Sequence, residues 1–557
     1  MLVLLSGAIS SNGQTVTLAT FGYDLYDNFS NLIQASDGNL YGVSDSFGGS
    51  PGNYGCPDGS SNECNFITRI TPDGTVTILH TFEMNSTTLA SDGYGPSSLI
   101  EAPDGMLYGT TIYGGSSGYG TIFRVSTTGT FTTLYTFPAD DSGNAPNGAY
   151  PGPLVLGSDG NFYGTTQGTV GGFVFFQLQP SGTFTMLHAP DKTESQYSYP
   201  SPLLQASDGN FYMTASGNIV QITPQGGVTL HYSFPSDGSG GANQGVLVEG
   251  PDENLYGTSE YSGYNSQDEE NGEGIVFRVS LSGAYKALYK FTGGADGFNP
   301  NSELTVGTDG NFYGTTYYGG NTTECTDSGP GCGTVFKISP SATFTSLYKF
   351  SQKATDGQRP YGRMLQGADG NFIGSYHADA ADLNSAFKLA IQPALNAPVQ
   401  LTFKPTTVAA NASTTLTWSV LNAFSKTMQQ CHASVRGSTT GASKGAGAWS
   451  GPQTGVLVGS VFTGHATITP TLSGTYTYVL NCGGIEVGSA ALSVGNGPTI
   501  TTTSLPNAKV SVGYKTNLDA TGGKPPVCLG SQRFPPCRTY DRYRRRRGRD
   551  THPVQHL

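Results

Sequence analysis

Short apolar runs alternate with turns rich in Gly, Asp and Asn over about the first 390 residues. One phrase returns seven times as an apolar run, an Asp-Gly or Asp-Glu turn and a second apolar run rich in Tyr and Phe. The copies begin at Leu32, Leu99, Leu154, Leu203, Leu247, Leu304 and Met364. Short apolar runs bounded by such turns are typical of β-strands joined in hairpins. The pattern therefore predicts seven hairpins.

Each copy continues with two more apolar runs. The third is GTIFRVS from Gly120 in one copy and GTVFKIS from Gly333 in another. The fourth is TFTTLYTF from Thr130 and TFTSLYKF from Thr343 in the same two copies. Four antiparallel strands per repeat of this length are typical of a β-propeller blade. The fold class expected is all-β, with a seven-bladed propeller.

The two ends of the repeat region are offset from each other by one strand. The last copy stops after its third strand, which starts at Ala386, and the missing fourth strand stands near the N-terminus as TVTLATF from Thr15. Pairing of these two segments would close the ring and remove two exposed sheet edges. Residues 15–392 are therefore expected to form the closed propeller.

These phrases closely resemble a known family of repeats. DGNFYGTT, followed by GTVFKIS and TSLYKF, is similar to the bacterial GloVer tandem repeat, and the resemblance covers roughly residues 15–392. It implies propeller-forming repeats in exported proteins, often beside surface-anchoring or Ig-like modules. It implies no particular biochemical activity.

The C-terminal part differs in composition. Residues 396–495 alternate as strands, with Trp418 and a Cys431–Cys482 bridge as their expected core. This stretch resembles the Ig-like β-sandwiches of bacterial surface proteins, a resemblance that implies a bridge between the two sheets. Residues 498–526 resemble the start of a second Ig-like unit that is truncated. The Arg-rich residues 527–557 show no strand pattern; we interpret them as a disordered frameshift product, the alternative being a basic tail that binds acidic polymers.

Charge and cysteine usage narrow the class of protein. The net charge is −12 although the tail is basic, so the rest of the chain is acidic and a nucleic-acid partner is disfavoured. No segment has the apolar length of a membrane span. The cysteines lack zinc-site spacing and predict disulfides at Cys56–Cys64 and Cys325–Cys332 besides Cys431–Cys482. Disulfides indicate an extracellular or cell-surface protein, and residues 1–14 are interpreted as part of a signal peptide.

No motif for catalysis, cofactor binding or metal binding stands out. GGSSG at residues 114–118 matches the nucleophile-elbow pattern formally, but that elbow needs a strand-to-helix turn. Calcium stays open as a cofactor, with the acidic run at residues 268–273 as its candidate site. The Tyr that recurs in six repeats could stack on sugars, but packing between blades explains such repetition better. Those residues are Tyr41, Tyr108, Tyr163, Tyr212, Tyr256 and Tyr313.

The expected function is a monomeric, non-catalytic binding or adhesion module outside the cell. Long blade-specific loops on a rigid scaffold favour recognition of a polysaccharide or a surface protein. The candidate ligand-binding residues are Tyr261, Tyr264, Tyr317 and Tyr318. Two alternatives stay open: a carbohydrate-active enzyme with acidic residues converging at the propeller axis, and a purely structural component of the cell envelope.

Overall fold

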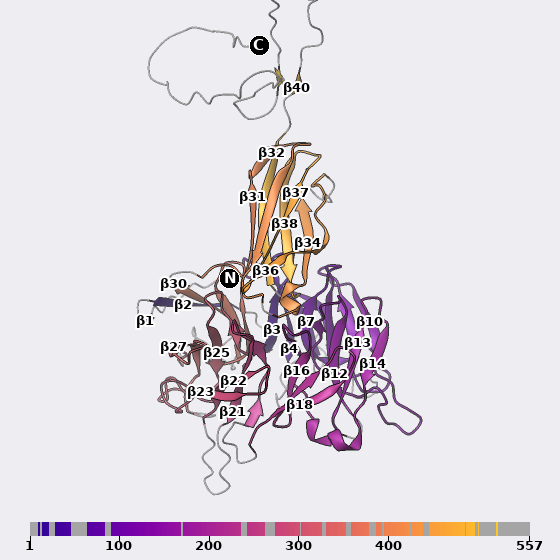
Figure 1. Cartoon of the computed structure of the whole chain (residues 1–557), viewed down its shortest axis with the longest axis vertical. Helices are drawn as coiled ribbons and strands as arrows, with labels where there is room; N and C mark the ends of the chain where they lie inside the picture. The colour runs from indigo at the N-terminus through magenta and orange to yellow at the C-terminus, as the bar shows by residue number, and fades with distance from the viewer. Residues whose placement is uncertain are drawn as a thin grey trace, which may run out of the picture.

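The structure is a computed structural model of the whole chain (Figure 1). It describes residues 9–11, 14–21, 28–45, 64–83, 91–168, 171–235, 242–261, 273–300, 302–325, 330–351, 358–377, 386–392, 395–423, 425–437, 445–484, 486–495, 499–500 and 520–521. These residues form sheets whose named strands pair antiparallel, except for the parallel pairing of Thr407–Ala409 with Glu486–Gly495, and two short 3-10 helices, η1 (Lys192–Tyr197) and η2 (Thr427–Gln429). Within this described part, none of the helical segments is long and apolar enough to cross a membrane.

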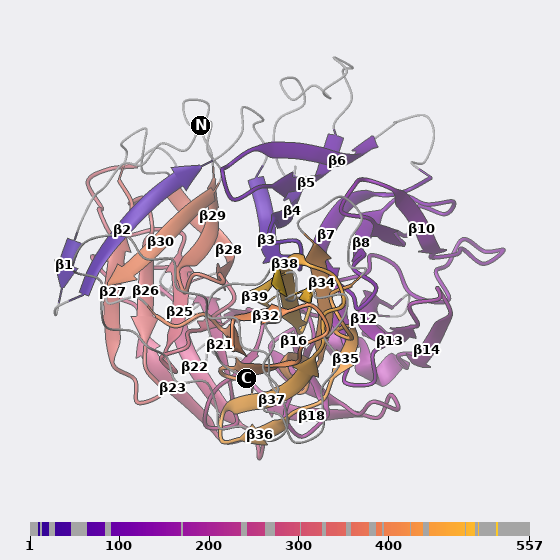
Figure 2. The same ribbon diagram turned by 90° about the horizontal axis from the view of Figure 1, so that it is seen from above.

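Seven sheets, one for each repeat, surround a common axis in a propeller-like arrangement (Figure 2). Sheet I contains β3 (Asn28–Gln34), β4 (Leu40–Asp45), β5 (Cys64–Ile70) and β6 (Val76–Glu83). Sheet II contains β7 (Tyr94–Glu101), β8 (Leu107–Tyr113), β9 (Thr121–Val125) and β10 (Phe131–Thr136). Sheet III contains β11 (Val155–Leu156), β12 (Phe162–Gln167), β13 (Phe173–Leu178) and β14 (Phe184–His188).

The remaining four sheets follow the same order from the axis outwards. Sheet IV contains β15 (Leu204–Gln205), β16 (Phe211–Ala215), β17 (Asn218–Ile222) and β18 (Val228–Ser233). Sheet V contains β19 (Ala242–Gln244), β20 (Val248–Glu249), β21 (Asn254–Tyr261), β22 (Ile275–Ser280) and β23 (Tyr285–Lys290). Sheet VI contains β24 (Thr305–Val306), β25 (Phe312–Thr316), β26 (Thr334–Ile338) and β27 (Phe344–Lys349). Sheet VII contains β28 (Gln358–Gln366), β29 (Phe372–His377), β30 (Ala386–Gln392), β2 (Gln14–Phe21) and β1 (Ile9–Ser11).

Sheet VII joins the two ends of the repeat region. β2 pairs antiparallel with β30 over seven residue pairs, from Thr15 opposite Gln392 to Phe21 opposite Ala386. This is the pairing that the offset of the repeats predicts. β1 adds a fifth strand at the outer edge of the sheet.

The recurring Tyr packs between neighbouring sheets. Tyr108 lies 4.5 Å from Phe162 of the next sheet, ring centre to ring centre, and Tyr313 lies 4.2 Å from Phe372. All six Tyr residues are buried. Each hydroxyl donates to the Asp of its own turn, as Tyr212 does to Asp208 at 2.9 Å. Packing between sheets, rather than sugar stacking, is thus confirmed as the role of these residues.

In most of the repeats, this Tyr is followed by a glycine on the second strand of the sheet. The missing side chain leaves room for the ring of a Phe from the third strand to lie against the second strand. A Cβ on Gly164 would lie 2.4 Å from the Phe176 ring, and one on Gly314 would lie 2.5 Å from the Phe336 ring. Such distances are well below van der Waals contact, so only glycine fits. The Tyr-Gly pair of the repeat is therefore explained by packing within and between sheets.

Two further sheets pack face to face above the ring, and we refer to residues 399–495 as the sandwich (Figure 1). One sheet contains β31 (Val399–Lys404), β33 (Thr414–Val420), β37 (Val461–Ile468) and β36 (Val456–Val458). The other contains β32 (Thr407–Ala409), β39 (Glu486–Gly495), β38 (Gly474–Cys482), β34 (Cys431–Gly437) and β35 (Gly451–Gln453). Trp418 and Trp449 lie together in the core between the sheets.

The Cys431–Cys482 disulfide forms, but it does not join the two sheets. Cys431 on β34 stands directly opposite Cys482 on β38, within one sheet. The expectation taken from the Ig-like resemblance is wrong on this point, because the two cysteines belong to neighbouring antiparallel strands. Beyond the sandwich, β40 (Thr499–Ile500) pairs with β41 (Ala520–Thr521), and residues 527–557 lie outside the described residues.

Candidate functional site

The ring of sheets has two faces with different chemistry. We call the end that carries the Asp-Gly turns the turn face and the opposite end the loop face. The loop face carries the connections between second and third strands and the connections from one sheet to the next. The sandwich lies on the turn face, and η1 lies on the far side (Figure 1).

The sandwich is attached to the turn face by polar contacts. Arg436 donates from its two terminal nitrogens to the carbonyl oxygens of Ser36 and Asp37. The backbone N–H of Glu101 donates to Gly484 O at 2.9 Å, and Asn481 donates from Nδ2 to the Glu101 carboxylate. These contacts hold the sandwich on the first two sheets.

A second group of contacts reaches sheet VI. Asn422 Nδ2 donates to Gly307 O at 2.5 Å, and Thr308 Oγ1 donates to Asn396 O at 3.0 Å. Sheets VI and I lie on either side of sheet VII in the ring, so the two groups of contacts are separated along the turn face. The sandwich therefore spans part of the ring instead of contacting a single sheet.

Neighbouring sheets are linked at one repeat position, which we call the seam position. It is the third residue of each opening apolar run, and its occupants are Gln34, Glu101, Leu156, Gln205, Glu249, Val306 and Gln366. Five of them accept a hydrogen bond from a backbone N–H in the preceding sheet's turn. Gln205 accepts from Ser158 at 2.8 Å, and Glu249 accepts from Ser207 at 2.9 Å.

The two exceptions have a simple cause. The turns facing Leu156 and Val306 carry Pro103 and Pro251 at the residue that donates elsewhere. Proline has no backbone N–H, so an acceptor there would have no donor. The apolar residue at the seam position thus matches the proline in the neighbouring repeat.

Burial affects the two glutamates at the seam. Desolvation raises the pKa of Glu101 and of Glu249 to about 7, while the hydrogen bonds from Ser36 and Ser207 oppose the shift. Glu101 accepts from Ser36 N at 2.7 Å and Ser36 Oγ at 2.5 Å. It therefore connects sheets I and II to the sandwich.

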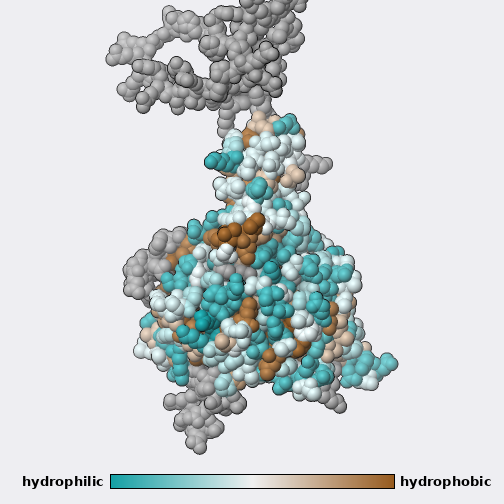
Figure 3. Space-filling model, in the orientation of Figure 1, coloured by the Kyte–Doolittle hydropathy of each residue, from teal (hydrophilic) through white to brown (hydrophobic). Residues whose placement is uncertain are grey.

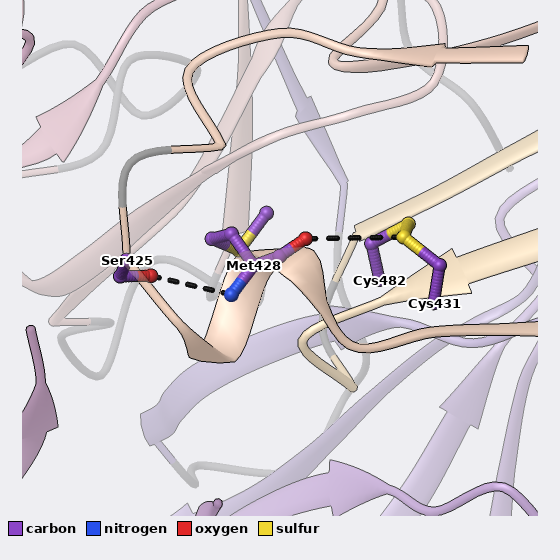
Figure 4. Close-up of a disulfide and its surroundings, with 4 residues drawn as sticks. All are labelled: Ser425, Met428, Cys431 and Cys482. Atoms are coloured by element: carbon purple, nitrogen blue, oxygen red, sulfur yellow. Dashed lines mark hydrogen bonds between the residues drawn. A yellow bond between two sulfur atoms is a disulfide. The ribbon is translucent and has the colours of Figure 1, made fainter. Parts of the chain in front are cut away.

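A cavity of about 180 Å³ lies on the axis between the ring and the sandwich. The innermost strands of sheets III to VII form most of its wall, with Leu203, Leu247, Leu304 and Met364 among the apolar residues. Met428 of η2 lines it from the sandwich. Met428 N donates to Ser425 Oγ at 3.2 Å, and its carbonyl oxygen lies 3.8 Å from Cys431 Sγ (Figure 4). The disulfide thus lies beside the segment that closes the cavity.

Two carboxylates line this cavity, and each has a partner. Glu303 pairs with Arg363 across 3.8 Å between Oε1 and Nη1, and Glu249 bonds to Ser207. Burial raises the pKa of Glu303, and the charge of Arg363 opposes this. Glycosidases use two carboxyl groups that flank the scissile bond. Among the described lining residues, the only two carboxylates are Glu303 and Glu249, and they already bind Arg363 and Ser207.

The loop face carries aromatic groups at matching places in two sheets. In sheet II, Tyr113 stacks on Tyr94, with ring centres 5.1 Å apart, and contacts Tyr150 edge to face. In sheet VI, Tyr318 stacks on Phe298 at 5.0 Å, and the Arg359 guanidinium lies over it at 6.0 Å. Tyr150 and Arg359 occupy the same repeat position.

Two of the four predicted ligand-binding residues can be described with their side chains. Tyr317 and Tyr318 are half-buried, and their rings meet edge to face at 4.6 Å. Tyr261 ends β21, and Tyr264 lies outside the described residues. Of the residues in this set whose side chains are described, Tyr317 and Tyr318 lie together. Among the described residues of the ring, the most exposed Tyr residues are Tyr150 and Tyr199, which the repeat pattern does not single out.

The other predicted groups can be located only in part. Cys325 and Cys332 form a disulfide beside these aromatic residues, whereas Cys56, the expected partner of Cys64, lies outside the described residues. The same holds for residues 268–270 of the acidic run. Within the described ranges, no three His, Cys, Asp or Glu side chains come together as a metal site would require.

An apolar patch is visible where the sandwich meets the ring, over β36 (Figure 3). Val456, Leu457 and Val458 are all exposed there. β36 is an edge strand that pairs only with β37 in its sheet. Its length of three residues restricts the pairing that an exposed edge could offer.

A repeat family matches most of the ring and part of the sandwich. The model described as the Gloeobacter/Verrucomicrobia repeat matches residues 54–218 and again residues 213–438. Among curated proteins, none matches the sequence of this chain.

The solved structures that match this chain are distant in sequence. PorZ, a surface component of the type-IX secretion system of Porphyromonas gingivalis, is 11% identical, with 85% of this chain and 59% of PorZ covered and a TM-score of 0.36. A putative gluconolactonase is 11% identical over 55% of this chain and 90% of its own, with a TM-score of 0.32. A Mycobacterium tuberculosis puromycin-hydrolyzing peptidase is 11% identical over 72% and 62%, with a TM-score of 0.36. This chain spans about three fifths of the length of PorZ and of the peptidase.

Proposed function

This chain belongs to the Gloeobacter/Verrucomicrobia repeat family, and from that premise we propose that it is a non-catalytic binding module that acts outside the cell. We infer that the seven sheets are the blades of one propeller and that residues 396–495 are an Ig-like sandwich. Binding is assigned to the loop face, with a polysaccharide as the partner.

One observation carries this proposal: the two faces of the ring are used differently. The sandwich covers part of the turn face through Arg436, Asn481 and Asn422. The loop face is built from connections that differ in length and sequence from one sheet to the next. Binding residues are commonly carried by such connections on a rigid scaffold.

One further feature supports an extracellular location, and another supports a role as a scaffold. Cys325–Cys332 and Cys431–Cys482 are disulfides, and disulfides persist in oxidising compartments. In addition, hydrogen bonds at the seam position join neighbouring sheets wherever the preceding turn offers a backbone N–H. Such links suit a rigid scaffold that presents loops.

The alternative function is hydrolysis of a carbohydrate at the axis. One observation favours it: Glu249 and Glu303 both line the axial cavity, and burial raises the pKa of each. Their existing partners, Ser207 and Arg363, count against it. The binding role is therefore preferred.

The test is binding of the full-length protein to an array of polysaccharides, with and without calcium, while soluble sugar release is assayed in parallel. The proposal expects selective binding without release of products. Release of sugars that disappears in the Glu303→Gln variant would favour the enzyme. A blank array would remove carbohydrate as the partner and leave a surface protein or a structural role.

A further inference from the structure

Five connections into the innermost strands share an unusual backbone geometry. In each, the residue before a proline has a positive φ. The pairs are Gly95-Pro96 (68°), Tyr150-Pro151 (57°), Tyr199-Pro200 (55°), Asn299-Pro300 (59°) and Arg359-Pro360 (54°). A residue before proline ordinarily adopts an extended conformation, and a bulky residue with positive φ is an outlier.

The backbone geometry does not require these side chains. The N–H of Tyr150 donates to Tyr119 O at 3.1 Å, and that of Arg359 donates to Cys332 O at 2.7 Å. The prolines that follow, Pro151 and Pro360, pack against Gly120 and Gly333, where a Cβ would lie about 2.6 Å from the proline ring. Glycine would serve this backbone better than Tyr or Arg, and one connection does use it, at Gly95.

Asn299 and Arg359 have structural contacts that account for their side chains. Asn299 is only 6% exposed and donates from Nδ2 to Glu260 Oε1 at 3.0 Å. Arg359 covers the Tyr318 ring. Tyr150 contacts Tyr113 edge to face at 5.3 Å but still has 44% of its surface exposed, and Tyr199 has 77% exposed. A strained position that presents an exposed aromatic ring needs another reason, and ligand contact is one such reason.

The exposed apolar residues of the ring concentrate in the same sector. Among its described residues, the large apolar side chains that are exposed are Tyr150, Met186, Tyr199 and Leu230. All four belong to sheets III and IV or to the connections that enter them. Two of the four, Tyr150 and Tyr199, stand at the same place in neighbouring sheets, directly before the proline that leads into the innermost strand.

The surrounding charge limits the ligand class. The connections at residues 138–150 and 189–199 contain four carboxylates and one lysine. Hydrogen bonds from Asn144 lower the pKa of Asp140, and those from Thr193 lower the pKa of Asp191, so both stay ionised at neutral pH. An acidic polymer would be repelled there. Tyr offers a flat apolar ring with a polar end, which suits an uncharged sugar ring.

We propose that Tyr150 and Tyr199 form a binding site for a neutral polysaccharide at the loop-face end of sheets III and IV. This inference rests on the proposed binding function and adds the residues and the charge class of the ligand. The two rings stack on pyranose units, and their hydroxyls bond to sugar hydroxyls.

The test compares three glycine variants of the full-length protein: Tyr150→Gly, Tyr199→Gly and, as the matched control, Asn299→Gly. Binding to the neutral polymers hydroxyethyl cellulose, laminarin and dextran and to the acidic polymers hyaluronan and polygalacturonate is measured. Each Tyr variant is expected to weaken neutral-polymer binding roughly tenfold or more, as loss of an anchoring aromatic residue does. The melting temperature should stay the same or rise, because glycine relieves the strain.

The outcomes separate the two proposals. Neutral-polymer binding that survives in both Tyr variants overturns this site and leaves the binding function standing. A preference for the acidic polymers overturns the assignment of the ligand as an uncharged polysaccharide. A fall in melting temperature with unchanged affinity assigns the rings to packing. If the unaltered protein binds none of these polymers, the polysaccharide function itself fails.

Discussion

Gln34 accepts a hydrogen bond at its Oε1 from the backbone N–H of Ala368 at 3.0 Å, across 334 residues of sequence. The bond joins sheet I to the turn of sheet VII. It repeats the contact that Gln366 makes with Thr308 and that Gln205 makes with Ser158. The first and last sheets therefore meet through the same seam contact as sheets that are neighbours in the sequence.

The first prediction concerns this closing contact. Gln34→Leu removes the acceptor and leaves the Ala368 N–H without it, which should lower the free energy of unfolding by about 1 kcal/mol. Urea unfolding followed by circular dichroism measures this. Gln34→Glu keeps an acceptor and serves as the control. Equal stability of the Leu and Glu variants would show that the hydrogen bond does not contribute to closure.

The second prediction concerns the seam positions that face a proline instead of a backbone N–H. Val306→Gln alone should destabilise, because its amide faces Pro251, which offers no N–H. Pro251→Ser supplies the missing donor, so the double variant should recover about 1 kcal/mol relative to the sum of the single changes. A double-mutant cycle by urea unfolding measures this coupling. A coupling energy of zero would mean that proline and apolar residue match by chance.

The third prediction is a pH dependence of stability at Glu101 and Glu249. Burial raises the pKa of both to about 7, against 4.5 as the ordinary value. The folded protein thus holds these protons more tightly than the unfolded chain does. The stabilisation that comes from this tighter proton binding is fully present below about pH 4.5 and is lost as the pH rises through 7.

Glutamine mimics the protonated carboxyl group at these positions. In the unaltered protein the free energy of unfolding should fall between pH 5 and pH 8. Glu101→Gln and Glu249→Gln should each make this fall smaller by on the order of 2 kcal/mol. Thermal unfolding at several pH values, compared with the unaltered protein, is the measurement. A pH profile identical to that of the unaltered protein would show that both groups keep an ordinary pKa.

The repeat pattern contains most of the information about the ring. The seven hairpins, the pairing of β2 with β30 and the packing role of Tyr108 or Tyr313 all follow from spacing and residue type. The repeat family follows from the same phrases. These features are local or repeated, so one sequence suffices to predict them.

Contacts between distant segments could not be predicted in this way. The spacing of Cys431 and Cys482 predicts a bridge but not the strand pairing that puts both in one sheet. Arg436 and Asn481 are ordinary polar residues in the sequence, and only the fold brings them to the turn face. Tyr199 was missed because its exposure depends on a positive φ before proline, which residue type alone does not indicate.

The fourth prediction tests the attachment of the sandwich. Arg436→Met keeps the aliphatic stem but removes the donors to Ser36 O and Asp37 O. Hydrogen bonds from a charged group contribute roughly 1.5–3 kcal/mol, so the sandwich should separate from the ring more often. Small-angle X-ray scattering should show a larger radius of gyration for the variant. Lys404→Met, on a strand of the sandwich away from these contacts, is the control, and equal radii for both variants would contradict the role of Arg436.

The last prediction uses the two tryptophans of the chain, Trp418 and Trp449, which both lie in the sandwich core with ring centres 5.4 Å apart. Tryptophan fluorescence therefore reports the sandwich, whereas far-UV circular dichroism reports the whole chain. Replacing both Cys431 and Cys482 by serine removes a cross-link between two residues that are 51 positions apart in the sequence. This loss should lower the free energy of unfolding of the sandwich by about 2–5 kcal/mol. The fluorescence transition should move to lower temperature, while most of the circular dichroism change stays in place because the ring does not contain this bridge. If both signals shift together, the sandwich and the ring unfold as one cooperative unit, and the contacts of Arg436 and Glu101 are then strong enough to couple them.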